Sequence, residues 1–217
     1  MINQAIIDRY MKVMTASVAD ACNEVVGKIC YMSYEIKPRI NDKKVVGPAV
    51  TVAEAPTTEN VPPVHALEAI DEAAEGSVLV IGMEGDVRDV AVWGGLMTAG
   101  AVVNKLAGAI LDAGVRDVTE IRRDFDFPVY SRSVSPGTTL GRYKTLAKNV
   151  SILCGGISVN PGDLIVADLD GVVVVPKDCI TKVLEVAEEI EHREAEQTKF
   201  IKETGSLQQG IAKFNRI

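Results

Sequence analysis

The chain has 217 residues, 47% of them hydrophobic, which is enough to bury one sizeable core or two small ones. Its net charge of −7 and sequence pI of about 5.0 argue against a nucleic-acid or anionic-membrane partner. The longest uncharged stretch, residues 90–104, is too short to cross a bilayer, and the first residues lack the basic and apolar parts of a secretory signal. We therefore expect a soluble, cytoplasmic protein.

The first quarter of the chain begins with helical spacing of apolar residues between positions 8 and 26. Thr15 or Ser17 is expected to cap a new helix there, and Gly27 to end it. A short strand is predicted at residues 36–40. A β-branched strand follows at residues 43–55, interrupted by a Gly-Pro pair.

The middle of the chain alternates predicted helices with apolar strands. In chain order they are a helix at 64–74, a buried strand at 77–82, a polar turn at 83–89, a helix at 96–106, a strand at 108–112, a short helix at 118–123 and a strand at 128–131.

The last third is richer in strands and ends in a charged helix. Strands are predicted at 150–154, 157–159, 163–168 and 172–176, and an amphipathic helix at 177–202. The polar face of that helix suits solvent, with subunit packing as the alternative. Because no repeat or linker is visible, we expect one mixed α/β domain over residues 1–217.

The cysteines do not predict a metal site. They form no CxxC pair, and only two histidines exist, so a zinc site of His and Cys is not expected. Buried reduced thiols are the simplest interpretation, and a Cys–His nucleophile is the alternative. The four residues are Cys22, Cys30, Cys154 and Cys179.

Two glycines, Gly94 and Gly95, separate Trp93 from the predicted helix at 96–106. Backbone N–H groups at such a helix start, here those of Gly95, Leu96 and Met97, can receive a carboxylate or an enolate. A close-packed turn between strand and helix would also explain the glycines. Neither the dinucleotide pattern GxGxxG nor a phosphate-binding GxxxxGK[ST] loop is present.

Arg116 and Asp117 follow the predicted buried strand, directly after Gly114 and Val115. Ligands of open α/β sheets bind outside the carboxyl ends of strands. Arg116 suits an oxyanion there, and Asp117 offers hard oxygen to a divalent cation. A surface ion pair that caps the next helix is the alternative.

Further charged residues also follow predicted strands. Arg142 is a candidate for a second substrate carboxylate, because Arg binds carboxylates bidentately. Asp86, Arg88 and Asp89 either line the same cleft or form a solvated loop. The acidic residues between 163 and 170 are interpreted mainly as turn formers; they are Asp163, Asp168 and Asp170.

Four segments together resemble the RraA-like family. They are TASVADA (15–21), GPAVTV (47–52), the stretch from WGGLMTAG through GVRDVTEI to FPVYSRSVSP (93–136), and DLIVADLDGVVVVP (163–176). Within them, twenty residues separate Gly95 from Arg116-Asp117, and Glu120 follows after two more. The family includes class II 4-hydroxy-4-methyl-2-oxoglutarate / 4-carboxy-4-hydroxy-2-oxoadipate aldolases and a regulator of ribonuclease activity. Members have also been labelled methyltransferases, but no Gly-rich adenosylmethionine loop is present here.

The resemblance implies an αββα-type sandwich around a small β-barrel, assembled as homotrimers or homohexamers with active sites between subunits. It implies Mg²⁺ or Mn²⁺ held by Asp117 and mostly by water. Arg116 would orient the pyruvyl oxygen. Gly94, Gly95 and the N–H groups of Leu96 and Met97 would bind the pyruvate carboxylate. Waters around the cation would be held by Glu120 and by a glutamate of the C-terminal helix, Glu194.

Two positions separate this chain from known branches of the family. Characterised aldolases tend to carry Asp or Glu where Gly95 stands, and the ribonuclease regulators lack the acid that Asp117 supplies. We therefore expect a metal-dependent lyase that cleaves or decarboxylates small 2-oxo acids. Gly95, Arg142 and the loop at 56–63 are expected to shape the distal pocket. The alternative is a non-catalytic regulator that binds a ribonuclease or helicase.

Overall fold

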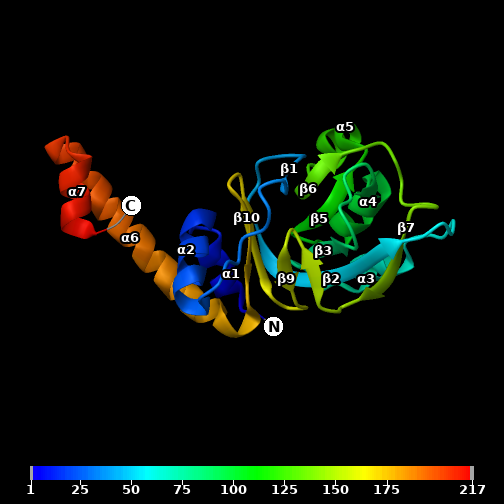
Figure 1. Cartoon of the computed structure of the whole chain (residues 1–217), viewed down its shortest axis with the longest axis horizontal. Coiled ribbons are helices and arrows are strands. Elements are labelled where there is room, and N and C mark those ends of the chain that lie inside the picture. The colour runs from blue at the N-terminus through cyan, green and yellow to red at the C-terminus, as the bar shows by residue number, and fades with distance from the viewer. Residues whose placement is uncertain (1, 216–217) are drawn as a thin grey trace.

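The computed structural model describes residues 2–215, and a nine-stranded sheet forms its centre (Figure 1). The main path of the sheet runs in the order β1 (Lys37–Pro38), β6 (Val129–Val134), β5 (Gly108–Val115), β3 (Val78–Met83), β2 (Val45–Pro56), β10 (Leu164–Asp168) and β11 (Gly171–Val175). Off this path, β4 (Ala91–Trp93) pairs with β5, and β7 (Tyr143–Lys148) pairs with β2. A separate hairpin joins β8 (Ile152–Cys154) and β9 (Ile157–Val159).

The strands β2, β3, β5, β6 and β4 are paired in parallel, so their carboxyl ends lie at one edge of the sheet. Each of β3 and β5 is buried along its whole length, as apolar strands with covered faces should be. The remaining pairs, which involve β1, β7, β10 and β11, are antiparallel. The parallel edge is therefore where a ligand site is expected.

The two ends of the sheet are brought together by the segment at residues 30–38. The N–H of Met32 donates to the carbonyl of Val172 (2.8 Å), and the N–H of Val174 donates to the carbonyl of Cys30 (2.8 Å). Lys37, in β1, donates its Nζ to the carbonyl of Leu169 (3.3 Å) in the β10–β11 turn. The sheet is thus a nearly closed barrel, and the expected α/β sandwich around a small barrel is confirmed.

Helices cover the barrel on two sides, and each set of helices buries a hydrophobic cluster against the sheet. On one side lie α3 (Val64–Glu72), α4 (Gly95–Val103), α5 (Val118–Glu120) and the π-helical turn Ile121–Phe125; on the other lie α1 (Gln4–Tyr10), α2 (Thr15–Val26) and α6 (Ile180–Thr204) (Figure 1). The first cluster centres on Trp93, Leu79 and Ile70, and the second on Tyr10, Leu164 and Leu184.

The start of α2 corrects the predicted cap. Met14, and neither Thr15 nor Ser17, occupies the N-cap position, and its side chain makes no cap hydrogen bond. Two N–H groups at this end are bound by remote carboxylates, because Met14 donates to Glu191 and Thr15 donates to Asp168 (3.1 Å). Such tertiary capping leaves no local sequence signal. Gly27 ends the helix in the left-handed conformation, as predicted.

Several other boundaries differ from the prediction. The strand at 36–40 shrinks to two paired residues, and β5 continues to Val115. The predicted helix at 118–123 is one α-helical turn followed by the π-helical turn. The strands β4 and β7 and the terminal helix α7 (Leu207–Phe214) were not predicted.

Beyond Ile190, α6 runs away from the barrel and pairs with α7 (Figure 1). Phe200 and Phe214 meet edge to face with centroids 6.0 Å apart, and the Lys213 ammonium lies 4.3 Å from the Phe200 ring centroid. No helix within residues 2–215 is long and apolar enough to cross a membrane.

Candidate active site

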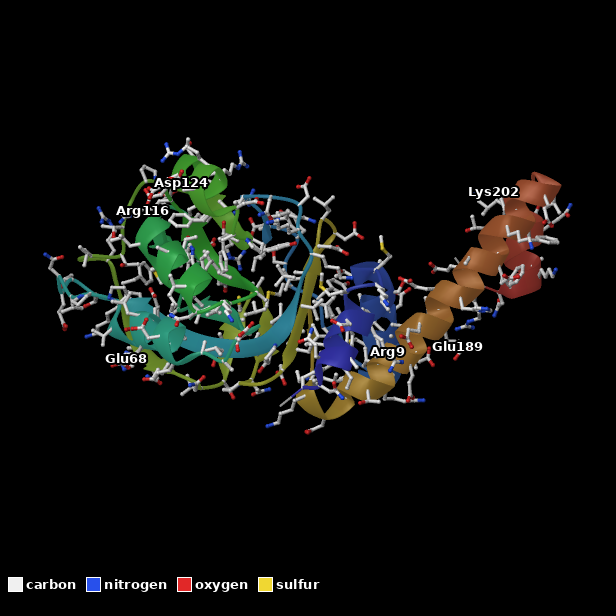
Figure 2. The ribbon with its side chains drawn as sticks, turned by 180° about the vertical axis from the view of Figure 1, so that it is seen from behind. Arg9, Glu68, Arg116, Asp124, Glu189 and Lys202 are labelled. Atoms are coloured by element: carbon white, nitrogen blue, oxygen red, sulfur yellow. The ribbon has the colours of Figure 1, made fainter. Side chains whose placement is uncertain are left out.

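The register of β4 and β5 brings the two candidate motifs together. Trp93 pairs with Val115, and the N–H of Arg116 donates to the carbonyl of Trp93 (2.9 Å). Gly94-Gly95 and Arg116-Asp117 therefore leave the carboxyl ends of neighbouring parallel strands side by side. Figure 2 shows Arg116 at this edge of the sheet.

Trp93 and Thr98 hold the start of α4, and sequence reasoning missed both. The Trp93 indole donates to the Thr98 hydroxyl (2.8 Å), which in turn donates to the carbonyl of Gly94 (3.0 Å). The Trp93 ring also stacks on Phe127 with centroids 6.0 Å apart. A buried Trp needs a partner for its N–H, so a hydroxyl five residues further on is a signal that sequence reasoning could have used.

Glycine at position 94 is required by close approach. A Cβ there would lie 2.7 Å from Asp117 Oδ2 and 3.1 Å from Arg116 Cγ. Any side chain at position 94 would push the Asp117 carboxylate and the Arg116 side chain away from the start of α4. Glycine at position 94 therefore allows the Arg116 and Asp117 side chains to lie this close to the start of α4.

Asp117 adopts the left-handed conformation, with φ of 58°, which Asp tolerates better than most residues. Its Oδ2 accepts the N–H of Gly95 (3.0 Å) and lies 3.5 Å from Arg116 Nε. Its Oδ1 makes no hydrogen bond within residues 2–215. The side chains of Arg116 and Asp117 are 42% and 38% exposed, so both are reachable by a small ligand.

The N–H groups of Leu96 and Met97, in the first turn of α4, donate no hydrogen bond in the described part of the chain. They point out of the helix N-terminus, where an anion is favoured. The N–H of Gly95, in contrast, is already bound by Asp117. Leu96 and Met97 therefore remain as the donors available to a carboxylate.

Glu120 fills the space beside Gly95. A Cβ at Gly95 would lie 2.9 Å from Glu120 Oε1 and 3.0 Å from its Cδ. An acidic side chain at position 95 would thus begin where the Glu120 carboxylate now lies. Asp117 and Glu120 flank the same pair of glycines from two sides.

This donor set fits a hydrated hard cation. Within residues 2–215, no three His, Cys, Asp or Glu side chains converge as a metal cage. Two neighbouring carboxylates suit Mg²⁺, which keeps several waters and binds through one or two carboxylates, and Mn²⁺ prefers similar ligands. Glu194 does not join them, because the part of α6 between Glu189 and Lys202 lies at the opposite end of the subunit from Arg116 (Figure 2).

Arg142 is occupied within its own loop. Its guanidinium donates to the carbonyls of Thr138 (3.0 Å) and Leu140 (3.4 Å), and its carbonyl accepts the N–H of Thr57 (2.8 Å). Among the described residues, it makes no ion pair or hydrogen bond with Arg116, Asp117 or α4. The structure joins Arg142 to the loop at 56–63 but not to the Arg116 turn.

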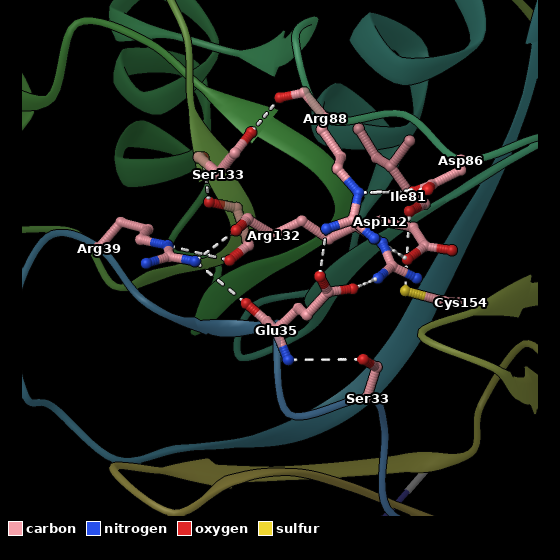
Figure 3. A network of polar contacts seen from close by, with 11 residues as sticks. Ser33, Glu35, Arg39, Ile81, Asp86, Arg88, Asp112, Arg132, Ser133 and Cys154 are labelled. Carbon is pink, nitrogen blue, oxygen red and sulfur yellow. Dashed lines mark hydrogen bonds and ion pairs between the residues drawn. The ribbon is translucent and has the colours of Figure 1, made fainter.

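Asp86 and Arg88 belong to a separate chain of ion pairs (Figure 3). Arg88 pairs with Asp86 (3.0 Å) and Glu35, Glu35 pairs with Arg132 (2.5 Å), and Arg132 pairs with Asp112 (2.7 Å). Burial raises the pKa of Asp112, and the adjacent Arg132 opposes that shift. This network ties the segment before β1 to the parallel strands, so it supports the barrel.

The last group of aspartates forms turns, as predicted. Asp163 accepts the N–H groups of Asn160 (2.8 Å) and Lys177 (3.0 Å), and Asp168 accepts that of Asp170 (3.0 Å). All four cysteines are free in the structure, and three of them are buried.

Comparison with known proteins identifies the family of the chain. The family model RraA-like, described as Aldolase/RraA, matches residues 15–174. A Halalkalibacterium halodurans protein, provisionally named a 4-hydroxy-4-methyl-2-oxoglutarate aldolase, is 34% identical over 184 residues, covering 83% of this chain and 81% of that protein.

Solved structures share the fold. An uncharacterized protein from Pseudomonas syringae superposes with a TM-score of 0.86 at 28% identity, covering 98% of this chain and 95% of the other. Streptomyces coelicolor RraAS2, described as an unusual member of an RNase ES inhibitor family, superposes with a TM-score of 0.82 at 23% identity, covering 93% and 100%. The family model matches most of the chain, and the H. halodurans protein is similar over most of its own length. The chain therefore belongs to the RraA-like family.

Proposed function

We propose that this protein is a divalent-metal-dependent lyase that cleaves or decarboxylates small 2-oxo acids through an enolate. One observation carries the proposal. The Arg116 guanidinium, the Asp117 carboxylate and the unbonded N–H groups of α4 meet at a single strand edge. The reaction involves three charges, and each has a counterpart here. The N–H groups suit the substrate carboxylate, Arg116 suits the developing oxyanion, and Asp117 suits a cation.

The substrate carboxylate is bound by the N–H groups of Leu96 and Met97 at the start of α4. Arg116 faces the 2-oxo oxygen and donates hydrogen bonds that strengthen as negative charge grows there. Its N–H bond to the carbonyl of Trp93 and the close approach of Gly94 hold it in position. The site is therefore preorganised for the charge of the enolate.

Asp117 and Glu120 hold Mg²⁺ or Mn²⁺. When bound, the cation supplies Lewis-acid stabilisation of the charge on the 2-oxo oxygen. The Asp117 oxygen that faces Arg116 and Gly95 is fixed by the Gly95 N–H, so that the carboxylate that would hold the cation is already oriented. Glu120 provides a second negative charge beside Gly95, where the aldolases of the family carry their acid.

The substrate class follows from the shared enolate. Retro-aldol cleavage of 4-hydroxy-4-methyl-2-oxoglutarate-type acids and decarboxylation of oxaloacetate both leave the pyruvate enolate in the site. The aldolase name of the H. halodurans relative supports the first reaction. Arg142 serves a distal carboxylate only if its guanidinium leaves the carbonyls of Thr138 and Leu140.

We also propose that copies of the chain form homotrimers or homohexamers with active sites between subunits. An apolar ridge lies exposed beside the site, since the α4 residues Leu96 and Val103 are 89% and 79% exposed. A cavity of about 510 Å³ is lined by residues of α2, of the segment at 31–34 and of the β10–β11 hairpin, among them Ala16, Ala19, Tyr31 and Tyr34. A ridge on one copy that fits a cavity on the next gives a head-to-tail contact that can close a ring. Glu194 can approach an Arg116 site only in a neighbouring copy.

A regulator that binds a ribonuclease or helicase is the second candidate. Gly95 favours it, because the family's aldolases carry an acid there, and Asp117 argues against it, because the regulators lack this acid. A pull-down with such partners separates the two. Retention of a ribonuclease or helicase by a protein without turnover would favour the regulator.

Pyruvate release tests the proposal most simply. Purified protein is freed of metal and titrated with Mg²⁺, Mn²⁺ and Co²⁺ in the presence of oxaloacetate and several 4-hydroxy-2-oxo acids. Metal-dependent pyruvate release from at least one of them is expected. No turnover with any cation across the panel would refute the lyase.

A further inference from the structure

Glu54 is a buried carboxyl group that the proposed lyase site does not use. It lies in β2 and is only 1% exposed, and neither of its carboxylate oxygens has a hydrogen-bond partner among residues 2–215. Its backbone is fixed, because its carbonyl accepts the N–H of Glu84 (2.9 Å). An ionised carboxylate without partners is costly to bury, so the closed structure favours the neutral acid.

The side of β2 on which Glu54 lies is apolar. Side chains two residues apart on a strand share a face, so Glu54 shares its face with Val52, which belongs to the hydrophobic cluster around Trp93. Opposite Glu54 in β7 is Thr145. The Thr145 hydroxyl accepts the N–H of His65 (3.2 Å) and lies 2.9 Å from His65 Nδ1, so the hydroxyl is bound by α3.

No cation pairs with Glu54 within the part of the chain that the structure describes. Lys148 of β7 is bound by Glu68 and Glu72 of α3, and Lys144 is bound by Glu59 (3.0 Å). Arg88, in the loop after β3, pairs with Asp86 and Glu35. The other titratable groups on the elements packed against this end of β2 are His65 and Asp71 of α3, Tyr143 of β7, and Glu84 and Asp89 after β3.

β7 is the neighbour of Glu54 that can separate with the least disruption. Among the described strands it pairs with β2 alone, and the extra residue Leu146 interrupts its ladder at the Glu54–Thr145 pair. β3, on the other side of β2, is itself paired on both of its edges. Local opening is therefore expected on the β7 side.

Two loops lie just beyond this end of the β2–β7 pair. The loop at 56–63 leaves β2, the loop at 138–142 enters β7, and both extend from the same end of the sheet (Figure 1). They are bonded to each other, because the N–H of Thr57 donates to the carbonyl of Arg142 (2.8 Å). Separation of β7 from β2 would therefore move both loops.

We propose that Glu54 is a pH-sensitive switch at the end of β2. Its neutral carboxyl group keeps β7 paired with β2, and release of its proton favours separation of β7 and opening of the two loops. The ionised carboxylate has no partner in the closed structure, whereas opening brings it to water. Opening is thus linked to the loss of one proton.

The direction and size of the effect follow from this linkage. Burial raises the pKa of Glu54 to about 7 in the closed structure, from the ordinary value of 4.5 that applies once the group reaches water. The closed state is therefore fully favoured below about pH 4.5, and opening increases as the pH rises toward about 7. The opening constant should be about fortyfold larger at pH 7 than at pH 5, and it should level off above pH 7.

The consequence for a substrate rests on the proposed lyase. The Arg142 guanidinium is bound by the carbonyls of Thr138 and Leu140 in the loop at 138–142. Opening of that loop would free the guanidinium for the distal carboxylate of an oxo acid. Amide exchange does not depend on turnover, so failure of the lyase and failure of the switch are separate results.

Hydrogen–deuterium exchange of the native full chain, measured by mass spectrometry between pH 5 and pH 8, tests the switch. Exchange times are scaled for the pH dependence of the intrinsic rate. Peptides that cover residues 54–63 and 139–147 should exchange about fortyfold faster at pH 7 than at pH 5, with little further change at pH 8. β3 and β5 should stay protected over the same times. An unchanged rate at the β2–β7 end, or an equal increase in β3 and β5, would overturn the proposal.

Three variants separate Glu54 from its neighbours. Glu54→Gln keeps the shape of the side chain and has no proton to lose, so the pH dependence should disappear. His65→Asn removes the imidazole beside Thr145, a side chain of the type that serves as a pH switch, and should keep the dependence. Glu59→Gln, at a 61% exposed carboxyl group, should also keep it.

Persistence of the pH dependence in Glu54→Gln, or its loss in His65→Asn, would overturn the assignment to Glu54. The wild-type exchange map decides by itself whether opening is confined to the β2–β7 end and levels off above pH 7. A variant that fails to fold therefore does not remove the test.

Discussion

The carboxylate of Glu120 lies where a side chain at Gly95 would begin, with Oε1 2.9 Å from that Cβ position. We propose that Glu120, twenty-five residues later, thus supplies in space the acid that the family resemblance leads us to expect at position 95. Glu120 reaches this place because β4 and β5 pair in parallel just before the two turns.

Gly95→Asp should therefore impair the site. The new carboxylate would meet Glu120 and repel it, so we expect kcat/KM for the preferred oxo acid to fall about tenfold, or about 1.4 kcal/mol. In Gly95→Asp combined with Glu120→Gln, the repulsion is removed and most of the activity should return. A single Gly95→Asp variant more active than the wild type would contradict the replacement.

Gly94→Ala should disable the site while the fold persists. Its Cβ would overlap Asp117 Oδ2 and displace the Asp117 and Arg116 side chains, so we expect turnover to fall about a hundredfold, as when an oxyanion donor is lost. Gly100→Ala in the same helix is the matched control, since its Cβ lies outside the site and meets only Cγ2 of Ile70, at 3.3 Å. Equal activity of the two variants would show that the close approach at Gly94 is unimportant.

Glu54 should make stability depend on pH. It is 1% exposed in β2, neither carboxylate oxygen has a hydrogen-bond partner within residues 2–215, and burial raises its pKa to about 7. Because the folded state holds the proton more tightly than the unfolded chain, the stability is fully present below about pH 4.5 and is lost as the pH rises through about 7. The expected loss is about 3 kcal/mol.

Urea unfolding from pH 5 to pH 8 measures this effect. Glu54→Gln removes the titrating group and should flatten the profile, whereas Glu75→Gln, at an exposed position, should keep the wild-type slope. If both variants lose stability with pH as steeply as the wild type, Glu54 is not responsible.

Leu96→Asp should dissociate the proposed assembly. A charge on the exposed α4 ridge cannot be buried in an apolar contact without a large cost, so light scattering should detect smaller particles and turnover should drop with them. Leu153→Asp, at a similarly exposed position on β8, is the control. Wild-type mass in the Leu96→Asp variant would place the subunit contact elsewhere.

The sequence predicted the elements whose signals are local. The apolar runs of β3 and β5 and the glycine that ends α2 were recognised because each depends on neighbouring residues only. β4 and β7 were missed because they are held by pairing with distant strands. The cap of α2 was wrong because its partners, Glu191 and Asp168, come from the other end of the chain.

The residues of the candidate site could be predicted from their spacing in the sequence, but the contacts between them could not. The spacing from Gly95 to Arg116 and Glu120 singled out the residues that the structure gathers at one strand edge. The contact between Glu120 and Gly95, and the Trp93–Thr98 bond that fixes the helix start, depend on strand register and burial. Arg142 was expected near the substrate, yet the carbonyls of its own loop bind its guanidinium.

Metal-dependent pyruvate release by Asp117→Asn tests the central claim most directly. Asn tolerates the left-handed backbone of position 117 and keeps the shape of the side chain, so the thermal unfolding midpoint should stay close to that of the wild type. We predict that stimulation by Mg²⁺ or Mn²⁺ disappears in this variant. Full metal-dependent turnover by a folded Asp117→Asn protein would contradict the assignment of Asp117 to the cation, and with it the proposed mechanism.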